Sequence, residues 1–193
     1  MVVLIAGLHD TAADVQMLEA MGVEARVVPV GLAGDLKTAL DNLDPASVDA
    51  FRIGPLDHPD IVEILGDFLG RIRVPVVLQV PLSHAHPELG DAIRDRLLPR
   101  TTLIASTDGE ASVLLGVPMQ DRVDMRRAGR TLAHLGVRAA LIRSAADDLL
   151  WVENRDYWLP ASSMPLAVAA VRAAGRMAQG EPVSEAARKS LQD

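Results

Sequence analysis

Short apolar runs rich in β-branched residues alternate along the chain with longer amphipathic segments, and this alternation constrains the fold more than any other feature. The apolar runs fall at residues 2–6, 25–30, 48–53, 75–80, 102–105 and 139–143, and the amphipathic segments include residues 11–21, 59–72, 87–98, 109–115 and 123–135. Such runs predict strands that are buried on both faces. Strands alternating with helices are typical of an α/β fold with parallel strands and right-handed crossovers. We therefore expect a three-layer αβα arrangement around a mostly parallel central sheet.

The alternation stops near residue 149. Residues 149–159 contain two short apolar or aromatic stretches on either side of the polar segment 153–156, which predicts a hairpin at an antiparallel edge of the sheet. Helices are expected at residues 166–179 and 183–191, and the segment 160–165, Pro-Ala-Ser-Ser-Met-Pro, joins the hairpin to the first of them. Because the chain has 193 residues and shows no repeat or linker, we expect one domain over residues 1–193, without a separate lid domain.

Composition argues against several classes of ligand and location. The net charge is -7 and no dense run of basic residues occurs, which argues against nucleic acid as a partner. The absence of cysteine excludes disulfides, thiol catalysis and cysteine-ligated metals. The apolar start of the chain reaches His9 and Asp10 too soon for a signal peptide or a membrane span. We therefore expect a cytoplasmic protein with no membrane partner.

Glycines and polar residues follow the predicted strands, at the positions where an open α/β sheet binds its ligands. These are Gly7 and His9 after the first strand, Gly54 after the third, His84 and His86 after the fourth, Thr107 and Glu110 after the fifth, and Arg143 after the sixth. The spacing of the histidines at 84 and 86 would place both imidazoles on one side of an extended segment. A metal site there and a simple polar loop both remain open.

Several segments, in this order, resemble the hydroxymethylpyrimidine and phosphomethylpyrimidine kinases of thiamin biosynthesis, which are members of the ribokinase-like superfamily. The segments that carry the resemblance are LIAG (4–7), AMGV (20–23), VDAFRIGPL (48–56), PVVL (75–78), LLPRTTLI (97–104), EASVLLG (110–116), LAHLGVRAALI (132–142) and AVAA (167–170). Together they span nearly the whole chain. None is specific alone, but their shared order and spacing support the assignment.

The resemblance implies a ribokinase-like fold, a homodimer, and ATP-dependent phosphorylation of hydroxymethylpyrimidine or its phosphate with magnesium. A small heterocyclic ligand is therefore the expected partner. Asp14 is similar in position to an aspartate that holds the pyrimidine, and Glu110 to a glutamate that organises magnesium and phosphate. Together with the positions after the strands, this places the expected substrate side at Gly7, His9, Asp14 and Gly54, and the expected nucleotide and magnesium side at Thr107, Glu110 and Arg143.

The chain departs from the family pattern mainly where phosphate would be handled. The glycine-rich Gly-Thr-Gly-Cys loop of the family is replaced by the short segment 160–165, in which Ser162 or Ser163 is nearest to the active position. Gln79 and Val80 replace an aspartate and a proline, and the glycines after the sixth strand are absent. Phosphoryl transfer depends on positioned groups that stabilise spread negative charge. We therefore predict a pseudokinase with little or no activity.

Structural interpretations compete with these functional ones. Glu110 and Asp14 both lie in the first turn of a predicted helix, where a carboxylate is favoured by the helix dipole whatever the function. Arg143 is as well suited to pairing with Asp147 or Asp148 as to binding a phosphate. Two other functions also stay open: a binding or regulatory module with a pocket near Asp14, and a structural subunit that oligomerises through the hairpin.

Overall fold

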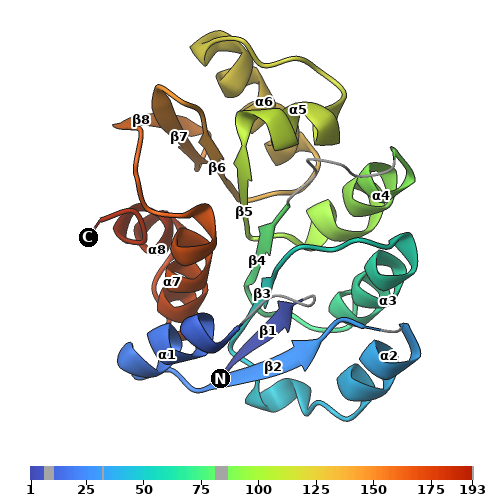
Figure 1. Ribbon diagram of the computed structural model, residues 1–193. Helices are drawn as coiled ribbons and strands as arrows, with labels where there is room; N and C mark the ends of the chain where they lie inside the picture. Colours follow the sequence, from blue (N-terminus) through green and yellow to red (C-terminus); the bar gives the residue numbers. More distant parts are fainter. Residues whose placement is uncertain (7–10, 32, 81–86, 193) are drawn as a thin grey trace.

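The computed structural model describes residues 1–6, 11–31, 33–80 and 87–192 and places its strands in one eight-stranded sheet (Figure 1). The strand order is β2-β1-β3-β4-β5-β6-β7-β8. Strands β1 to β6 are parallel to one another. Strand β7 pairs antiparallel with β6, and β8 pairs antiparallel with β7. The strands are β1 (Val2–Ala6), β2 (Ala25–Pro29), β3 (Ala50–Ile53), β4 (Val76–Gln79), β5 (Leu103–Thr107), β6 (Ala139–Arg143), β7 (Asp147–Val152) and β8 (Arg155–Pro160). The predicted α/β fold with an antiparallel hairpin at its edge is confirmed.

Helices cover both faces of the sheet, as Figure 1 shows. One face is covered by α1 (Ala12–Ala20), α7 (Leu166–Ala178) and α8 (Val183–Lys189). The other is covered by α2 (Ala33–Asp41), α3 (Pro59–Leu69), α4 (Pro87–Ala92), α5 (Asp108–Leu115) and α6 (Arg122–His134). Shorter helical turns are η1 (Pro45–Ser47), η2 (Ile93–Leu97) and η3 (Leu98–Arg100). Within the described parts of the chain, no helix combines the length and apolar character needed to cross a bilayer.

The first strand shows why the apolar runs become the centre of the fold. Val3 and Ile5 belong to the core under one layer of helices, and Val2 and Leu4 belong to the core under the other. All four residues are fully buried. Because successive side chains in a strand point to opposite faces, an uninterrupted apolar run supplies both cores. Full burial of each such side chain contributes about 1.5 to 3 kcal/mol.

Helix α7 packs closely through its small residues. Ala169, Ala170, Ala173 and Ala174 are buried against the sheet, and Gly175 lies against helix α1. A Cβ atom at Gly175 would lie 2.7 Å from Cε of Met21 and 2.9 Å from Cδ2 of Leu18, both near the end of α1. The alanine-rich sequence therefore allows the helix to approach both its neighbours closely.

Three local features differ from the sequence prediction. Helix α2 was not expected, because it buries only Leu36 and Leu40 and its remaining sequence is mostly polar. The predicted helix at residues 87–98 is divided into α4, the π-helical turn η2 and the start of η3. The hairpin turn contains only Glu153 and Asn154, whose φ angles of 53° and 61° suit a tight two-residue turn. The joint at residues 160–165 is as predicted, since β8 ends at Pro160 and α7 begins at Leu166.

Candidate functional site

The predicted site residues that the structure describes fall into two groups at the carboxyl edge of the sheet. Asp14 and Gly54 lie near the ends of β1 and β3, which are neighbours in the sheet. The second group surrounds the ends of β5, β6 and β8, and consists of Thr107, Glu110, Arg143, Ser162 and Ser163. Four further predicted residues, Gly7, His9, His84 and His86, lie outside the described residues. Among the residues that are described, no three histidine, aspartate or glutamate side chains are grouped to hold a metal ion.

A buried arginine occupies the first group, and sequence reasoning gave it no role. Arg52 of β3 is 3% exposed, and its Nη2 atom donates a hydrogen bond of 2.6 Å to Oε1 of Gln79 at the end of β4. The same nitrogen lies 3.9 Å from Oδ2 of Asp14. Burial lowers the pKa of Arg52 from its ordinary value, and the attraction of the Asp14 carboxylate offsets part of this effect. A charged residue inside an apolar strand is rare unless it is paired, and this was the available signal.

Gly54 provides space for the Arg52 side chain. A Cβ atom on Gly54 would lie 2.3 Å from Nη1 of Arg52. The backbone N-H of Gly54 also donates to the carbonyl of Ile5 at 2.7 Å, which fixes the chain beside β1. The geometry gives this glycine a packing role, and its predicted contact with a substrate stays a prediction.

Thr107 and Glu110 form a reciprocal capping box at the start of α5. The backbone N-H of Glu110 donates to Oγ1 of Thr107 at 3.2 Å, and the backbone N-H of Thr107 donates to Oε2 of Glu110 at 2.7 Å. This arrangement satisfies two amide groups that a helix start would otherwise leave without partners. The structural interpretation of Glu110 therefore holds, while its role toward magnesium and phosphate stays a prediction.

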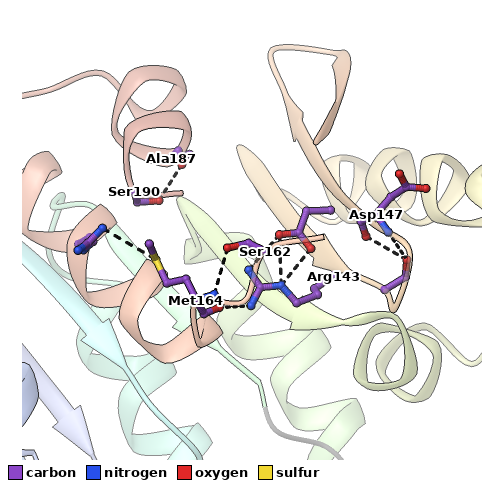
Figure 2. Close-up of polar contacts among 9 residues, drawn as sticks. Arg143, Asp147, Ser162, Met164, Ala187 and Ser190 are labelled. Carbon is purple, nitrogen blue, oxygen red and sulfur yellow. Dashed lines mark hydrogen bonds and ion pairs between the residues drawn. The ribbon is translucent and has the colours of Figure 1, made fainter. Parts of the chain in front are cut away.

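Arg143 connects the hairpin to the joint at residues 160–165 (Figure 2). Its Nε atom lies 3.0 and 3.2 Å from the two carboxylate oxygens of Asp148, and its Nη2 atom lies 2.9 Å from Oδ2. Its Nη1 atom donates to the backbone carbonyl of Met164. Of the two acidic partners considered for Arg143, Asp148 is the one observed. The neighbouring Asp147 instead receives hydrogen bonds from Arg122, which hold the pKa of that carboxyl below its usual range.

The joint uses its own polar groups internally. Oγ of Ser162 accepts a hydrogen bond of 3.1 Å from the backbone N-H of Met164, and the Met164 carbonyl accepts from Arg143, as Figure 2 shows. Pro165, the residue before α7, has no N-H and makes no side-chain cap. Ser163 is exposed. Thus neither backbone group of Met164 is free to bind a ligand.

Two hollows adjoin the second group of site residues. One, of about 400 Å³, lies between the joint and the end of α8 and is lined by Ser162, Ser163 and Arg188 among others. The other, of about 270 Å³, lies beside the start of α5 and is lined in part by Asp108 and Asp147. Both volumes lie at or near the lower end of the range of small-molecule sites, which begins at about 300 Å³.

Comparison with known proteins shows the family. Residues 33–191 match the profile of the phosphomethylpyrimidine kinase family. The chain belongs to this family. It is 30% identical over 138 residues to the hydroxymethylpyrimidine/phosphomethylpyrimidine kinase of Synechococcus elongatus, an alignment that covers 68% of this chain and 51% of that protein. It is 31% identical over 133 residues to the corresponding Streptomyces coelicolor protein, covering 62% of this chain and 48% of the relative. The chain thus spans about half the length of the curated relatives that it matches.

Solved structures of the same superfamily share the fold. A phosphomethylpyrimidine kinase from Clostridium difficile superimposes with a TM-score of 0.86 at 18% identity, covering 99% of this chain and 97% of that one. A pyridoxal kinase from Staphylococcus aureus, solved in complex with pyridoxal, gives a TM-score of 0.87 at 19% identity, covering 98% of this chain and 83% of that one. At these identities the likeness establishes the ribokinase-like fold.

Proposed function

We propose that this member of the phosphomethylpyrimidine kinase family has little or no kinase activity. The reason is that the groups at the edge where the family would handle phosphate make structural contacts within the protein instead. The observation that carries the proposal is the position of Arg143. Its guanidinium is bound by the carboxylate of Asp148, which is 1% exposed, and by the carbonyl of Met164. An arginine that binds a transferring phosphoryl group must direct its donors toward the ligand. Here Nε, Nη1 and Nη2 each have an acceptor within the protein, so three of the five N-H groups are directed into the fold.

The joint supports the same conclusion. Binding of a phosphoryl group at a helix start relies on several backbone N-H groups that converge on one point. In this chain the N-H of Met164 is bonded to Ser162, and Pro165 supplies none. Removal of a single donor of this kind commonly raises a reaction barrier by about 3 to 4 kcal/mol. Two missing donors would therefore suppress turnover severely.

The test is a measurement of phosphoryl transfer to hydroxymethylpyrimidine and to its phosphate. The chain would be incubated with magnesium and ATP, and ADP formation and ³¹P spectra would be followed, with the related Escherichia coli protein as the positive control. We expect ADP formation at the rate of the protein-free reaction. Saturable, magnesium-dependent transfer that disappears in the Glu110→Gln variant would overturn the proposal.

A second candidate function is binding of a small heterocycle without turnover. It is favoured by the contrast between Asp14, whose side chain is 18% exposed, and the Arg52 side chain beside it, which is only 4% exposed. Part of the Asp14 side chain thus lies at the surface, where a ligand could contact it, and the Arg52 guanidinium lies 3.9 Å from it. Thermal melting with hydroxymethylpyrimidine should show stabilisation that Asp14→Asn reduces. Absence of any shift with pyrimidines, thiamin intermediates and nucleotides would exclude this candidate.

A further inference from the structure

A hollow lined by three arginines lies at the edge of the sheet opposite the candidate site. Its volume is about 410 Å³. Arg73 comes from the loop before β4, Arg100 from the turn before β5, and Arg138 from the residue before β6. Because these three strands are parallel neighbours, their amino ends meet at one edge and bring the three loops together. We call this feature the arginine hollow.

The arginine hollow has an excess of positive charge that the surrounding protein does not neutralise. No aspartate or glutamate lines it, and within the described residues none of its three arginines forms an ion pair. Arg73 donates only to the carbonyl of the preceding residue, at 3.3 Å. By contrast, Arg94 and Arg96 of η2 both pair with carboxylates. In a chain with a net charge of -7, three unpaired cations around one hollow are a marked local reversal of sign.

The polar groups of the arginine hollow are arranged as donors. Thr102, which is 8% exposed, lines it, and its Oγ1 atom accepts the backbone N-H of Val76 at 3.1 Å. Because Oγ1 uses a lone pair in this bond, the hydroxyl hydrogen of Thr102 is left to donate. An arginine side chain offers five N-H donors and no acceptor. A hollow whose charged and hydroxyl groups all donate favours a ligand that only accepts, and an oxyanion has this property.

We propose that the arginine hollow binds a small molecule that carries a phosphate group. Arginine matches phosphate oxygens in a bidentate manner, and Arg100 and Arg138 come from adjacent loops that can hold one group between them. The volume of about 410 Å³ lies toward the lower end of the range of about 300 to 1,000 Å³ that small-molecule sites occupy. Apolar residues such as Leu69, Ile72 and Val74 complete the lining and give the remainder of the ligand a surface to contact. This site is separate from the carboxyl edge and does not depend on kinase activity.

Calorimetric titration with inorganic phosphate and with pyrophosphate at low salt would test the proposal. The test variant is Arg100→Gln/Arg138→Gln, and the matched control is Arg26→Gln/Arg155→Gln. The control removes the same charge from two exposed arginines elsewhere, neither of which forms an ion pair among the described residues. We expect the wild type and the control to bind pyrophosphate with one-to-one stoichiometry. Loss of charged hydrogen bonds should weaken binding by the test variant about tenfold or more.

Thermal melting supplies a second readout that distinguishes a lost site from a lost fold. Without ligand, the test variant should melt at or above the wild-type temperature, since it removes repulsion between like charges. Pyrophosphate should raise the melting temperature of the wild type and the control but not that of the test variant. Absence of saturable binding to the wild type would overturn the proposal. Equal weakening in the control would do so as well, because it would show attraction by diffuse charge instead of a site.

Discussion

Replacement of Asp148 by asparagine should destabilise the protein far more than the same change at the adjacent Asp147. Both carboxylates receive hydrogen bonds from an arginine, Asp148 from Arg143 and Asp147 from Arg122. The two pairs differ in burial, because the side chains of Arg143 and Asp148 are 14% and 1% exposed, whereas those of Arg122 and Asp147 are 59% and 20% exposed. Removal of the counter-charge from a poorly solvated cation destabilises the folded state strongly. Exposed ion pairs, by contrast, contribute little to stability.

The magnitude follows from the contacts of Arg143. Asp148→Asn removes the negative charge that faces Nε and Nη2 at 2.9 to 3.2 Å. Removal of one partner from a buried pair costs about 3 to 5 kcal/mol. Asparagine retains one acceptor oxygen, and the Arg143 side chain is itself 14% exposed, so the expected loss is near the lower end, about 3 kcal/mol. In a domain of this size such a loss lowers the melting temperature by about 6 to 12 °C.

Urea unfolding monitored by circular dichroism and tryptophan fluorescence would measure this loss, since Trp151 and Trp158 lie in the hairpin beside the pair. The double variant Arg143→Met/Asp148→Leu should recover most of the stability, because it removes both charges and fills the space with apolar atoms. An equal loss in Asp148→Asn and Asp147→Asn would refute the reasoning. It would mean that the buried pair is no more important to the fold than the exposed one, and that Arg143 is available for other contacts.

Three further predictions rest on single contacts. Gly54→Ala should force Arg52 away from its position and lower the free energy of unfolding in urea by at least about 1 kcal/mol. As a control, Gly34→Ala in helix α2, where nothing lies within 4 Å of the new Cβ, should raise it by about 0.5 to 1 kcal/mol. Thr107→Ala should cost about 1 kcal/mol through loss of the α5 cap, a change that Thr107→Ser would largely avoid and that calorimetry would detect. Hydrogen bonds from Trp158 and Arg126 lower the pKa of Asp156, so the stability that they confer is present above the ordinary aspartate pKa and is lost as the pH falls through the lower folded-state value. The melting temperature should therefore fall less steeply between neutral and acid pH for Asp156→Asn than for the wild type.

The parallel sheet was predictable because its signal is strong and local. Runs such as residues 2–6 are apolar throughout, and only a strand between two layers of helices buries every side chain of such a run. The antiparallel edge was also visible, since two stretches interrupted by Glu153 and Asn154 leave too little chain for a crossover helix. Helix α2 was missed because only Leu36 and Leu40 of this helix are buried, and two leucines one turn apart are a weak helical pattern.

The candidate site was less predictable because its contacts join distant parts of the chain. The capping box of Thr107 and Glu110 spans three residues, and the sequence already offered a structural interpretation of Glu110 in the first turn of a predicted helix. The contact between Arg143 and the carbonyl of Met164 spans 21 residues, and a backbone acceptor leaves no trace in side-chain patterns. Arg52 was visible in the sequence as an arginine inside an apolar run. Its partner Gln79, which is 27 residues away, becomes its neighbour only when β3 and β4 pair.

Arg52 and Arg143 share one arrangement at the carboxyl edge, and this arrangement bears on how the proposed loss of kinase activity could be reversed. Arg52 is bound by Gln79 from the neighbouring strand, and Arg143 is bound by Asp148 in the same manner. Donors that are already bonded within the protein can serve a ligand only if those contacts break, and a buried acceptor such as Asp148 would then lack its partner. Glycines introduced into residues 160–165 would restore backbone donors but would leave Arg143 bound to Asp148. Under the proposed loss of kinase activity, we therefore expect recovery of phosphoryl transfer to need a change at Asp148 as well as in the joint.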